Sequence, residues 1–460
     1  MADVVNSPKR VSINPLKMSQ PLGAAMAFMG VDRCMPVLHG SQGCTSFGLV
    51  LLVRHFKEAI PFQTTAMNEV STILGGIDNI EEAVLNIVKR AKPRIIAIAS
   101  TGLVETRGED VAGDIKMIRK RHPELADTAL VYASTPDFAF AFQDGWAKGV
   151  TALIEDQVVK VDTKIAGQVN ILVGCHVTPG DIEEIRDMCE AFGLSPLVIP
   201  DISGSLDGHI EDNWLGTTTG GTTLEQLRSA GASDFTFAIG EQMRPAAEML
   251  RSIADVPYRV FPRLSGLFAS DSFVEALMKL SGRPVPAKIK RQRSQLQDAM
   301  LDGHFYFGNQ RVAIGAEPDL LANVGHLCAD MGAFVVAAVT TTHSPVLAGL
   351  PVDKVVIGDL DDLETAAETH GATLLMTHSH GRQAAERLSL PLYRIGFPSF
   401  DHIGAAHKRS VLYRGTRDFI FELSNVFIDA MPHHGPEHWT HGEDTPTSAK
   451  GGDHARTASH

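Results

Sequence analysis

Short, continuous apolar runs recur along nearly the whole chain, and a longer amphipathic stretch follows each of them. A run without polar alternation indicates a strand that is covered on both faces, as in a parallel sheet. Alternation of such strands with helices predicts doubly wound α/β units. The runs that we interpret as strands are Ile95–Ser100, Leu130–Ser134, Val169–Gly174, Pro196–Pro200, Asp234–Gly240, Arg311–Ala316, Phe334–Thr340, Val355–Gly358, Leu374–His378 and Leu392–Phe397.

The pattern of strands and helices restarts twice, near Thr163–Val169 and near Gln310. The chain has 460 residues, a length that accommodates about three domains. We therefore predict a first Rossmann-like domain at residues 1–162, a second at 163–305 that ends in a linking helix, and a third at 306–432. Residues 433–460 hold six of the 19 histidines and few apolar side chains. We expect a disordered tail there, with metal binding as the alternative.

Charge and hydropathy exclude several classes of protein. The net charge of −13 argues against a general nucleic-acid-binding protein, which needs a basic face to neutralise phosphates. The sequence holds no stretch of about 18 uninterrupted apolar residues, so we expect no transmembrane helix. The short apolar segment Pro21–Val31 is interpreted as a buried helix rather than a signal peptide, and a cytoplasmic location is expected.

The common catalytic signatures of α/β proteins do not occur in the sequence. There is no G-x-G-x-x-G after a predicted strand, no phosphate-binding G-x-x-x-x-G-K-[ST] loop and no G-x-S-x-G nucleophile elbow. A generic dinucleotide-dependent oxidoreductase, ATPase or hydrolase therefore has no local support. The fold class alone supplies no function.

The cysteines are few, odd in number and widely spaced, which makes a disulfide framework unexpected. No C-x-x-C pair occurs, so the chain is not expected to hold a zinc ribbon or a ferredoxin-type cluster by itself. A metal bound through thiolates would need ligands from another chain. The five cysteines are Cys34, Cys44, Cys175, Cys189 and Cys328.

The segment from His39 to Thr45 is the sharpest local feature, because two glycines bracket a Ser-Gln pair and Cys44 follows at once. Gly40 and Gly43 would allow positive φ and a close approach of the backbone to a bulky ligand. Cys44 would lie in the loop or first turn of a helix, where unpaired N–H groups favour a thiolate. A metal-ligating sulfur and a small buried cysteine beside a tight turn both fit this pattern.

Other cysteines and polar loops each have a functional and a structural interpretation. Cys189 and Cys328 lie in helical patterns and are predicted to pack in the core. Cys34 leads into a strand, and the Cys175-His176 pair follows one, where it could be catalytic or lie at the edge of the core. The loops that could bind a ligand or only connect elements are Gly75–Asn79, Asp201–Gly208, Thr217–Thr223 and the stretch with His378 and His380.

Longer motifs carry a resemblance to a known family. The runs SQPLGAAMAFMG from Ser19, MPVLHGSQGCTSF from Met35 and RHFKEAIPFQTTAMNEVSTILGG from Arg54 occur in order, followed by KRQRSQLQDAMLDGH from Lys290 and RIGFPSFDHIG from Arg394. Together they resemble the β-type branch of the nitrogenase component 1 family. The similarity extends from about Ser12 to about Phe427, and it implies three Rossmann-like domains.

The chain departs from the catalytic members of this family at their cluster-binding cysteines. Catalytic β chains supply three cysteines to an eight-iron cluster; this sequence keeps only Cys44, with Ser19 and Gly102 at the other two positions and Asp137 at a nearby serine position. The resemblance therefore implies a [4Fe–4S] cluster, to which Cys44 contributes one ligand and an E-type partner subunit the other three.

The resemblance further implies a scaffold that assembles the nitrogenase iron–molybdenum cofactor. This chain and a NifE-type subunit would form an α2β2 heterotetramer. A NifB-type precursor donor, a NifH-type reductase and the nitrogenase acceptor would bind to it transiently. Molybdenum and homocitrate would be inserted into an iron–sulfur precursor that the partner mainly holds. This chain shows no cysteine in the loop Phe237–Met243 and no histidine in Gly396–Asp401.

We consequently expect no catalytic residue and no precursor ligand in this chain, with His378 and His380 as candidates for transient contacts only. The alternatives within the family are a component 1 β chain, a scaffold subunit of the vanadium system and the B-type subunit of dark protochlorophyllide reductase. The alternative outside it is a metal-free binding protein in which Cys44 is a core thiol.

Overall fold

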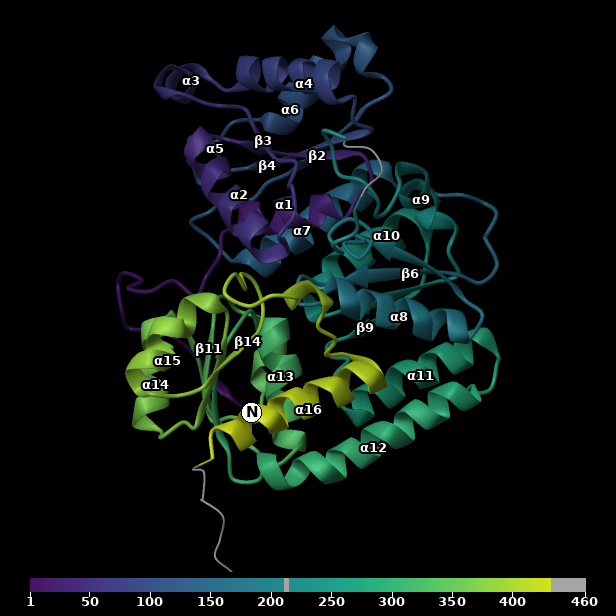
Figure 1. The fold of residues 1–460 in the computed structure, drawn as a ribbon. Coiled ribbons are helices and arrows are strands. Elements are labelled where there is room, and N and C mark those ends of the chain that lie inside the picture. The colour runs from purple at the N-terminus through teal and green to yellow at the C-terminus, as the bar shows by residue number, and fades with distance from the viewer. Residues whose placement is uncertain (211–214, 432–460) are drawn as a thin grey trace, which may run out of the picture.

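Three parallel β-sheets, each flanked by helices, make up the computed structural model, which describes residues 1–210 and 215–431 (Figure 1). The first sheet has the order β3-β2-β4-β5 and the second has the order β7-β6-β8-β9. The third has the order β1-β12-β11-β10-β13-β14. Every strand pair within them is parallel, so the predicted α/β class with parallel sheets is confirmed.

The strands alternate with helices in all three units. The strands are β1 Asp3–Asn6, β2 Cys34–His39, β3 Gln63–Thr64, β4 Ile95–Ser100, β5 Ala129–Ala133, β6 Gln168–Val173, β7 Ser195–Ile199, β8 Phe235–Ile239, β9 Tyr258–Phe261, β10 Arg311–Gly315, β11 Phe334–Thr340, β12 Lys354–Ile357, β13 Leu374–Thr377 and β14 Leu392–Arg394. The α-helices are α1 Gln20–Met29, α2 Gln42–Phe56, α3 Glu69–Leu74, α4 Ile77–Ala91, α5 Gly102–Arg107, α6 Val111–Arg121, α7 Phe142–Gln157, α8 Pro179–Ala191, α9 Leu224–Ser229, α10 Arg244–Ala254, α11 Leu267–Ser281, α12 Ala287–Phe307, α13 Pro318–Asp330, α14 Leu360–Thr369, α15 Arg382–Leu388 and α16 Leu412–Asp429. Short 3-10 helices are η1 Pro123–Leu125, η2 Ala230–Ala232, η3 Glu241–Met243, η4 Pro345–Gly349, η5 Ser379–Gly381 and η6 Ala405–His407.

All ten predicted strands are present, and most bounds differ from the prediction by one residue or none. The exception is β14, which ends at Arg394 rather than Phe397. The segment Pro21–Val31 is confirmed as a buried helix, because every residue of α1 is buried. None of the described helices is long and apolar enough to cross a membrane.

The N-terminal strand departs from the predicted division into domains. We placed residues 1–162 in the first domain, but β1 pairs in parallel with β12 of the third sheet, from Asp3 opposite Lys354 to Asn6 opposite Ile357. The ammonium of Lys9 reinforces this pairing through ion pairs with Asp361 at 3.1 Å and Asp362 at 3.2 Å. The N-terminal segment is thus part of the third unit.

The remaining boundaries stay predictions. The division at residue 162 falls in the connection between α7 and β6, and the division at residue 305 falls inside α12, which continues to Phe307. The C-terminal helix α16 packs beside α12 and α8 of the second unit (Figure 1). The predicted tail at residues 433–460 lies outside the described residues.

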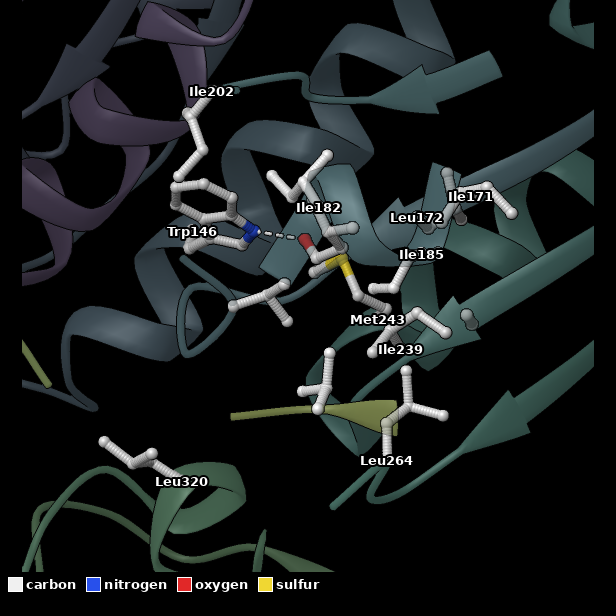
Figure 2. Packing of buried hydrophobic residues seen from close by; sticks show 14 of the residues in the cluster. Trp146, Ile171, Leu172, Ile182, Ile185, Ile202, Ile239, Met243, Leu264 and Leu320 are labelled. Atoms are coloured by element: carbon white, nitrogen blue, oxygen red, sulfur yellow. Dashed lines mark hydrogen bonds between the residues drawn. The ribbon is translucent and has the colours of Figure 1, made fainter. Parts of the chain in front are cut away.

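Helices α1 and α7 cross at very short range because glycines face each other's backbone. A Cβ at Gly145 would lie 1.9 Å from the carbonyl oxygen of Gln20, and a Cβ at Gly23 would lie 2.0 Å from that of Phe142. Trp146, the residue after Gly145, donates a hydrogen bond from Nε1 to the carbonyl oxygen of Val173 at 2.7 Å. This indole packs among buried aliphatic side chains of the second unit (Figure 2). This close packing holds the N-terminal end of α1 in place beside the candidate site.

The N-terminus of α13 connects all three units. The carboxylate oxygen Oδ2 of Asp319 accepts hydrogen bonds from the backbone and side-chain nitrogens of Gln242 in η3, at 2.9 and 3.0 Å. The side chain of Gln143 in α7 accepts from the backbone N–H of Asp319 at 3.2 Å. Burial is complete here, and it raises the pKa of Asp319 to about 6, with the negative charges of Glu241 and Asp144 acting in the same direction.

Replacing Asp319 by asparagine is expected to flatten the pH dependence of stability between about pH 4 and 6. The folded carboxyl keeps a proton in this window that the unfolded chain has released, because its ordinary pKa is 3.8. The free energy of unfolding of the native sequence therefore falls as pH rises through the window and stays lower above it. Asp319→Asn removes that loss. Urea unfolding at pH 4, 5, 6 and 7 tests this; parallel profiles for the two proteins would contradict it.

Candidate functional site

Cys44 lies in the first turn of α2, as predicted. Strand β2 ends at His39, Ser41 takes the N-cap position in extended conformation, and the helix begins at Gln42. The thiol is exposed to solvent and lies 3.5 Å from the hydroxyl of Ser41. The first turn of a helix leaves backbone N–H groups without intrahelical partners, and Cys44 lies among them. Exposure overturns the alternative of a small buried cysteine.

The two glycines before Cys44 have different roles, and neither adopts the positive φ that we expected. Gly40 is required by packing, since a Cβ there would lie 2.4 Å from the hydroxyl oxygen of Thr101. Gly43 is unconstrained: the atom nearest to its Cβ position is the hydroxyl of Ser41 at 4.0 Å.

The other cysteines are not exposed. Cys34, Cys189 and Cys328 are buried, and burial raises the pKa of each thiol, that of Cys328 to about 12. The predicted core positions of Cys189 and Cys328 are confirmed. Desolvation raises the pKa of Cys175 well above its ordinary value and lowers that of His176 to about 4. This pair holds a thiol and a neutral imidazole, not the thiolate that a nucleophile needs.

A hollow of about 480 Å³ borders Cys44 and gathers residues from four other parts of the chain. Ser19 at the start of α1, Thr101 before α5, Asp137 after β5 and His380 in η5 line it together with the thiol. Three of the positions singled out by the resemblance, Ser19, Cys44 and Asp137, therefore lie in one place, and Gly102 follows Thr101 directly. Lys17, two residues before Ser19, also lines this hollow.

Ser19 and Gly102 stand where catalytic chains of the family have cysteines, and Gly102 contacts Asp137. The backbone N–H of Gly102 donates to Asp137 Oδ2 at 3.4 Å, and a Cβ at residue 102 would lie only 3.1 Å from the Cβ of Asp137. Burial raises the pKa of the Asp137 carboxyl. Ser19 caps α1 without a side-chain hydrogen bond to the helix. Cys44 is consequently the one thiol at this hollow.

The donor set fits a metal cluster that takes a single ligand from this chain. Within residues 1–210 and 215–431, no group of three or more histidine, cysteine or acidic side chains is arranged to hold a metal ion. Cys44 supplies a soft thiolate ligand of the type that iron–sulfur clusters use. The exposed sulfur and the ammonium of Lys17 in the same hollow suit a negatively charged cluster.

Apolar side chains surround the Cys44 hollow without being covered. Phe47, one turn after Cys44, is 68% exposed, and Phe138, next to Asp137, is 69% exposed. Leu103 follows Gly102 and is also exposed. Clusters of large exposed apolar residues mark interaction sites more often than isolated ones do. Further exposed apolar residues on α2 and α3 include Val50, Val53, Val70 and Ile73.

The remaining candidate loops have structural contacts. A Cβ at Gly76 would lie 2.6 Å from the buried ring of His39, so Gly75–Asn79 is the packed N-cap loop of α4. Thr218 donates to the carbonyl of Val31 at 2.5 Å, and the N–H of Asp201 donates to that of Gly30 at 2.9 Å. The loops Asp201–Gly208 and Thr217–Thr223 thus join the first two units.

The loops Phe237–Met243 and Gly396–Asp401 carry neither cysteine nor histidine, and their side chains make structural contacts. Within Phe237–Met243, Gln242 bonds Asp319, as described above. Within Gly396–Asp401, the ring of Phe397 stacks on Phe142 at 5.0 Å, and Asp401 pairs with Arg394 at 2.8 Å. His378 is buried, and His380 lines the Cys44 hollow.

Comparisons with known proteins agree with this geometry over nearly the whole chain. A family model described as nitrogenase component 1 type oxidoreductase matches residues 19–428. The chain is 54% identical over 448 residues to the nitrogenase iron-molybdenum cofactor biosynthesis protein NifN of Bradyrhizobium diazoefficiens, covering 95% of each chain. It is 39% identical to the NifN protein of Klebsiella pneumoniae, covering 94% of this chain and 95% of that one.

A solved structure described as nitrogenase Cp1 at pH 6.5 superposes with a TM-score of 0.89 at 31% sequence identity, covering 94% of this chain and 97% of the other. The two chains therefore share their fold over nearly their full lengths. The resemblance inferred from the motifs around Cys44 is confirmed: the chain belongs to the nitrogenase component 1 family.

Proposed function

We propose that this chain is a subunit of the scaffold on which an iron–sulfur precursor is matured into the nitrogenase iron–molybdenum cofactor by insertion of molybdenum and homocitrate. Relatives at 54% and 39% identity over almost their full lengths are named as iron-molybdenum cofactor biosynthesis proteins. The observation that carries the proposal is a single exposed thiol, Cys44, in a hollow where Ser19 and Gly102 offer no further sulfur.

Cys44 provides one ligand to a [4Fe–4S] cluster shared with a NifE-type partner, which contributes the other three. Such a cluster supplies one-electron transfer when bound. In this chain, Cys44 is exposed in the first turn of α2, and Lys17 lines the same hollow, where its positive charge offsets negative charge. Phe47, Leu103 and the neighbouring apolar residues supply a contact surface for the partner, in an α2β2 heterotetramer.

The precursor itself is held mainly by the partner, because the loops Phe237–Met243 and Gly396–Asp401 of this chain carry neither cysteine nor histidine. A NifB-type donor, a NifH-type reductase and the nitrogenase acceptor bind the assembly transiently. This chain contributes no catalytic residue. The alternative within the family is a component 1 β chain or a vanadium-system scaffold subunit, and the side chains at positions 19, 102 and 137 argue against the former.

Cofactor maturation in a reconstituted system tests the proposal. Precursor, molybdate, homocitrate and reductase are supplied with the NifE-type partner, with or without this chain, and activation of cofactor-free nitrogenase is measured. We expect activation only when this chain is present with its partner. Equal activation without it would contradict a scaffold role, and intrinsic substrate reduction by the complex at the level of nitrogenase would favour the component 1 β chain.

A further inference from the structure

His380 shares the hollow of Cys44, although it comes from the third unit. It lies in η5, which follows β13 at the carboxyl end of the third sheet, and its half-buried ring lines the same space of about 480 Å³. Within residues 1–210 and 215–431, the ring nitrogens of His380 make no hydrogen bond and no ion pair. A partly buried imidazole at a hollow, with no hydrogen-bond partner in the described part of the protein, is available to a ligand there.

The neighbouring His378 shows that this availability is specific to one of the two histidines. His378 is buried; its Nε2 lies 3.1 Å from the carbonyl oxygen of Leu16, and its Nδ1 accepts the backbone N–H of His380 at 3.3 Å. Both ring nitrogens of His378 are therefore used within the fold. His378 has a structural role: it fixes the backbone of η5 and with it the place of His380.

Aromatic contacts hold the His380 ring in position. Its centroid lies 5.2 Å from that of Phe400 and 5.1 Å from that of His378, both in edge-on geometry. Burial lowers the pKa of His380, and the charge of Arg54 acts in the same direction, while Asp401 opposes it. The ring is accordingly neutral near pH 7 and presents one N–H donor and one lone pair.

We propose that His380 is a positioning residue for the iron–sulfur group at Cys44, to which it donates an N–H hydrogen bond from the third unit. This inference rests on the proposed function. A hydrogen bond to a cluster sulfur stabilises the reduced state, which carries the greater negative charge, and so raises the reduction potential. His380 would then couple the third unit to the redox state of a group anchored in the first.

The test compares His380→Ala, His380→Gln and the control His370→Ala, each in the complex with the NifE-type partner. His370 is an exposed histidine between α14 and β13. Reduced cluster is quantified by EPR at a fixed potential. We expect His380→Ala to lower the ratio of reduced to oxidised cluster about tenfold, which corresponds to ~59 mV for a one-electron couple. His380→Gln, which keeps an N–H donor, should recover part of this ratio, and His370→Ala should not change it.

Each outcome decides the inference. Loss of the cluster in His380→Ala but retention in His380→Gln would support the same placement of the donor. An unchanged ratio in His380→Ala, with a cluster that still depends on Cys44, would overturn this inference and leave the proposed function intact. A wild-type complex without any cluster signal would overturn both.

Discussion

Cys44→Ala is expected to abolish the shared [4Fe–4S] cluster while the chain keeps its fold. The thiol is exposed at the first turn of α2, and no hydrogen bond within the core depends on it. Losing one of four thiolate ligands leaves one iron without its protein ligand, so we expect less than a tenth of the wild-type EPR signal. Iron analysis and EPR of the dithionite-reduced complex measure this directly.

The matched control is Ser46→Ala, an exposed position two residues further along the same helix. It changes a side chain of similar size on α2 without touching the sulfur, and we expect it to keep the wild-type signal. Circular dichroism and co-purification with the partner separate loss of the cluster from loss of the fold. An unchanged cluster spectrum in Cys44→Ala would remove Cys44 as a ligand.

Gly145→Ala should cause the largest loss of stability among single substitutions near the site. The new Cβ would lie 1.9 Å from the carbonyl oxygen of Gln20, so α1 and α7 would have to separate. The clash is between two helix backbones, which cannot move aside as a flexible side chain could. We therefore expect the free energy of unfolding to fall by about 3 kcal/mol, the upper end of the usual cost of overpacking. Urea unfolding of the purified chain measures the loss.

Displacement of α1 would also disturb the Cys44 hollow, because the helix begins beside Ser19. The side chain of Gln20 anchors this end by donating to the carbonyls of Pro136 and Ala139, at 2.7 and 2.5 Å. We therefore expect Gly145→Ala to weaken cluster binding as well as stability. Gly349→Ala is the control, since its Cβ would meet no atom within 4 Å. Equal stability of the two variants would contradict the tight-crossing account.

The repeated units were predictable because buried parallel strands are continuous apolar runs. Ile95–Ser100 and Phe334–Thr340 have the predicted bounds, since all or most of their residues are buried. The four-residue β1 could not be assigned in this way, because only two of its residues are apolar and its partner β12 lies some 350 residues further along the chain. Pairing over such a separation depends on tertiary packing, which local periodicity does not encode.

The site was predictable only in part. Gly40, Cys44 and the start of α2 form a local pattern, and the motifs of the family added Ser19, Gly102 and Asp137. His380 could not be placed from sequence, because the third sheet brings it to the hollow from a different unit. The exposed apolar residues around Cys44 were missed for another reason: Phe47 lies in a run that suits a buried helix equally well.

Anaerobic iron quantification with EPR, made on this chain alone and on its complex with the NifE-type partner, tests the central claim most directly. The claim is that Cys44 is one ligand of a cluster completed by another chain. We predict iron and a reduced [4Fe–4S] signal in the complex, and neither in the isolated chain. Stoichiometric cluster iron in the isolated chain would contradict the account, because the ligands would then all come from this chain.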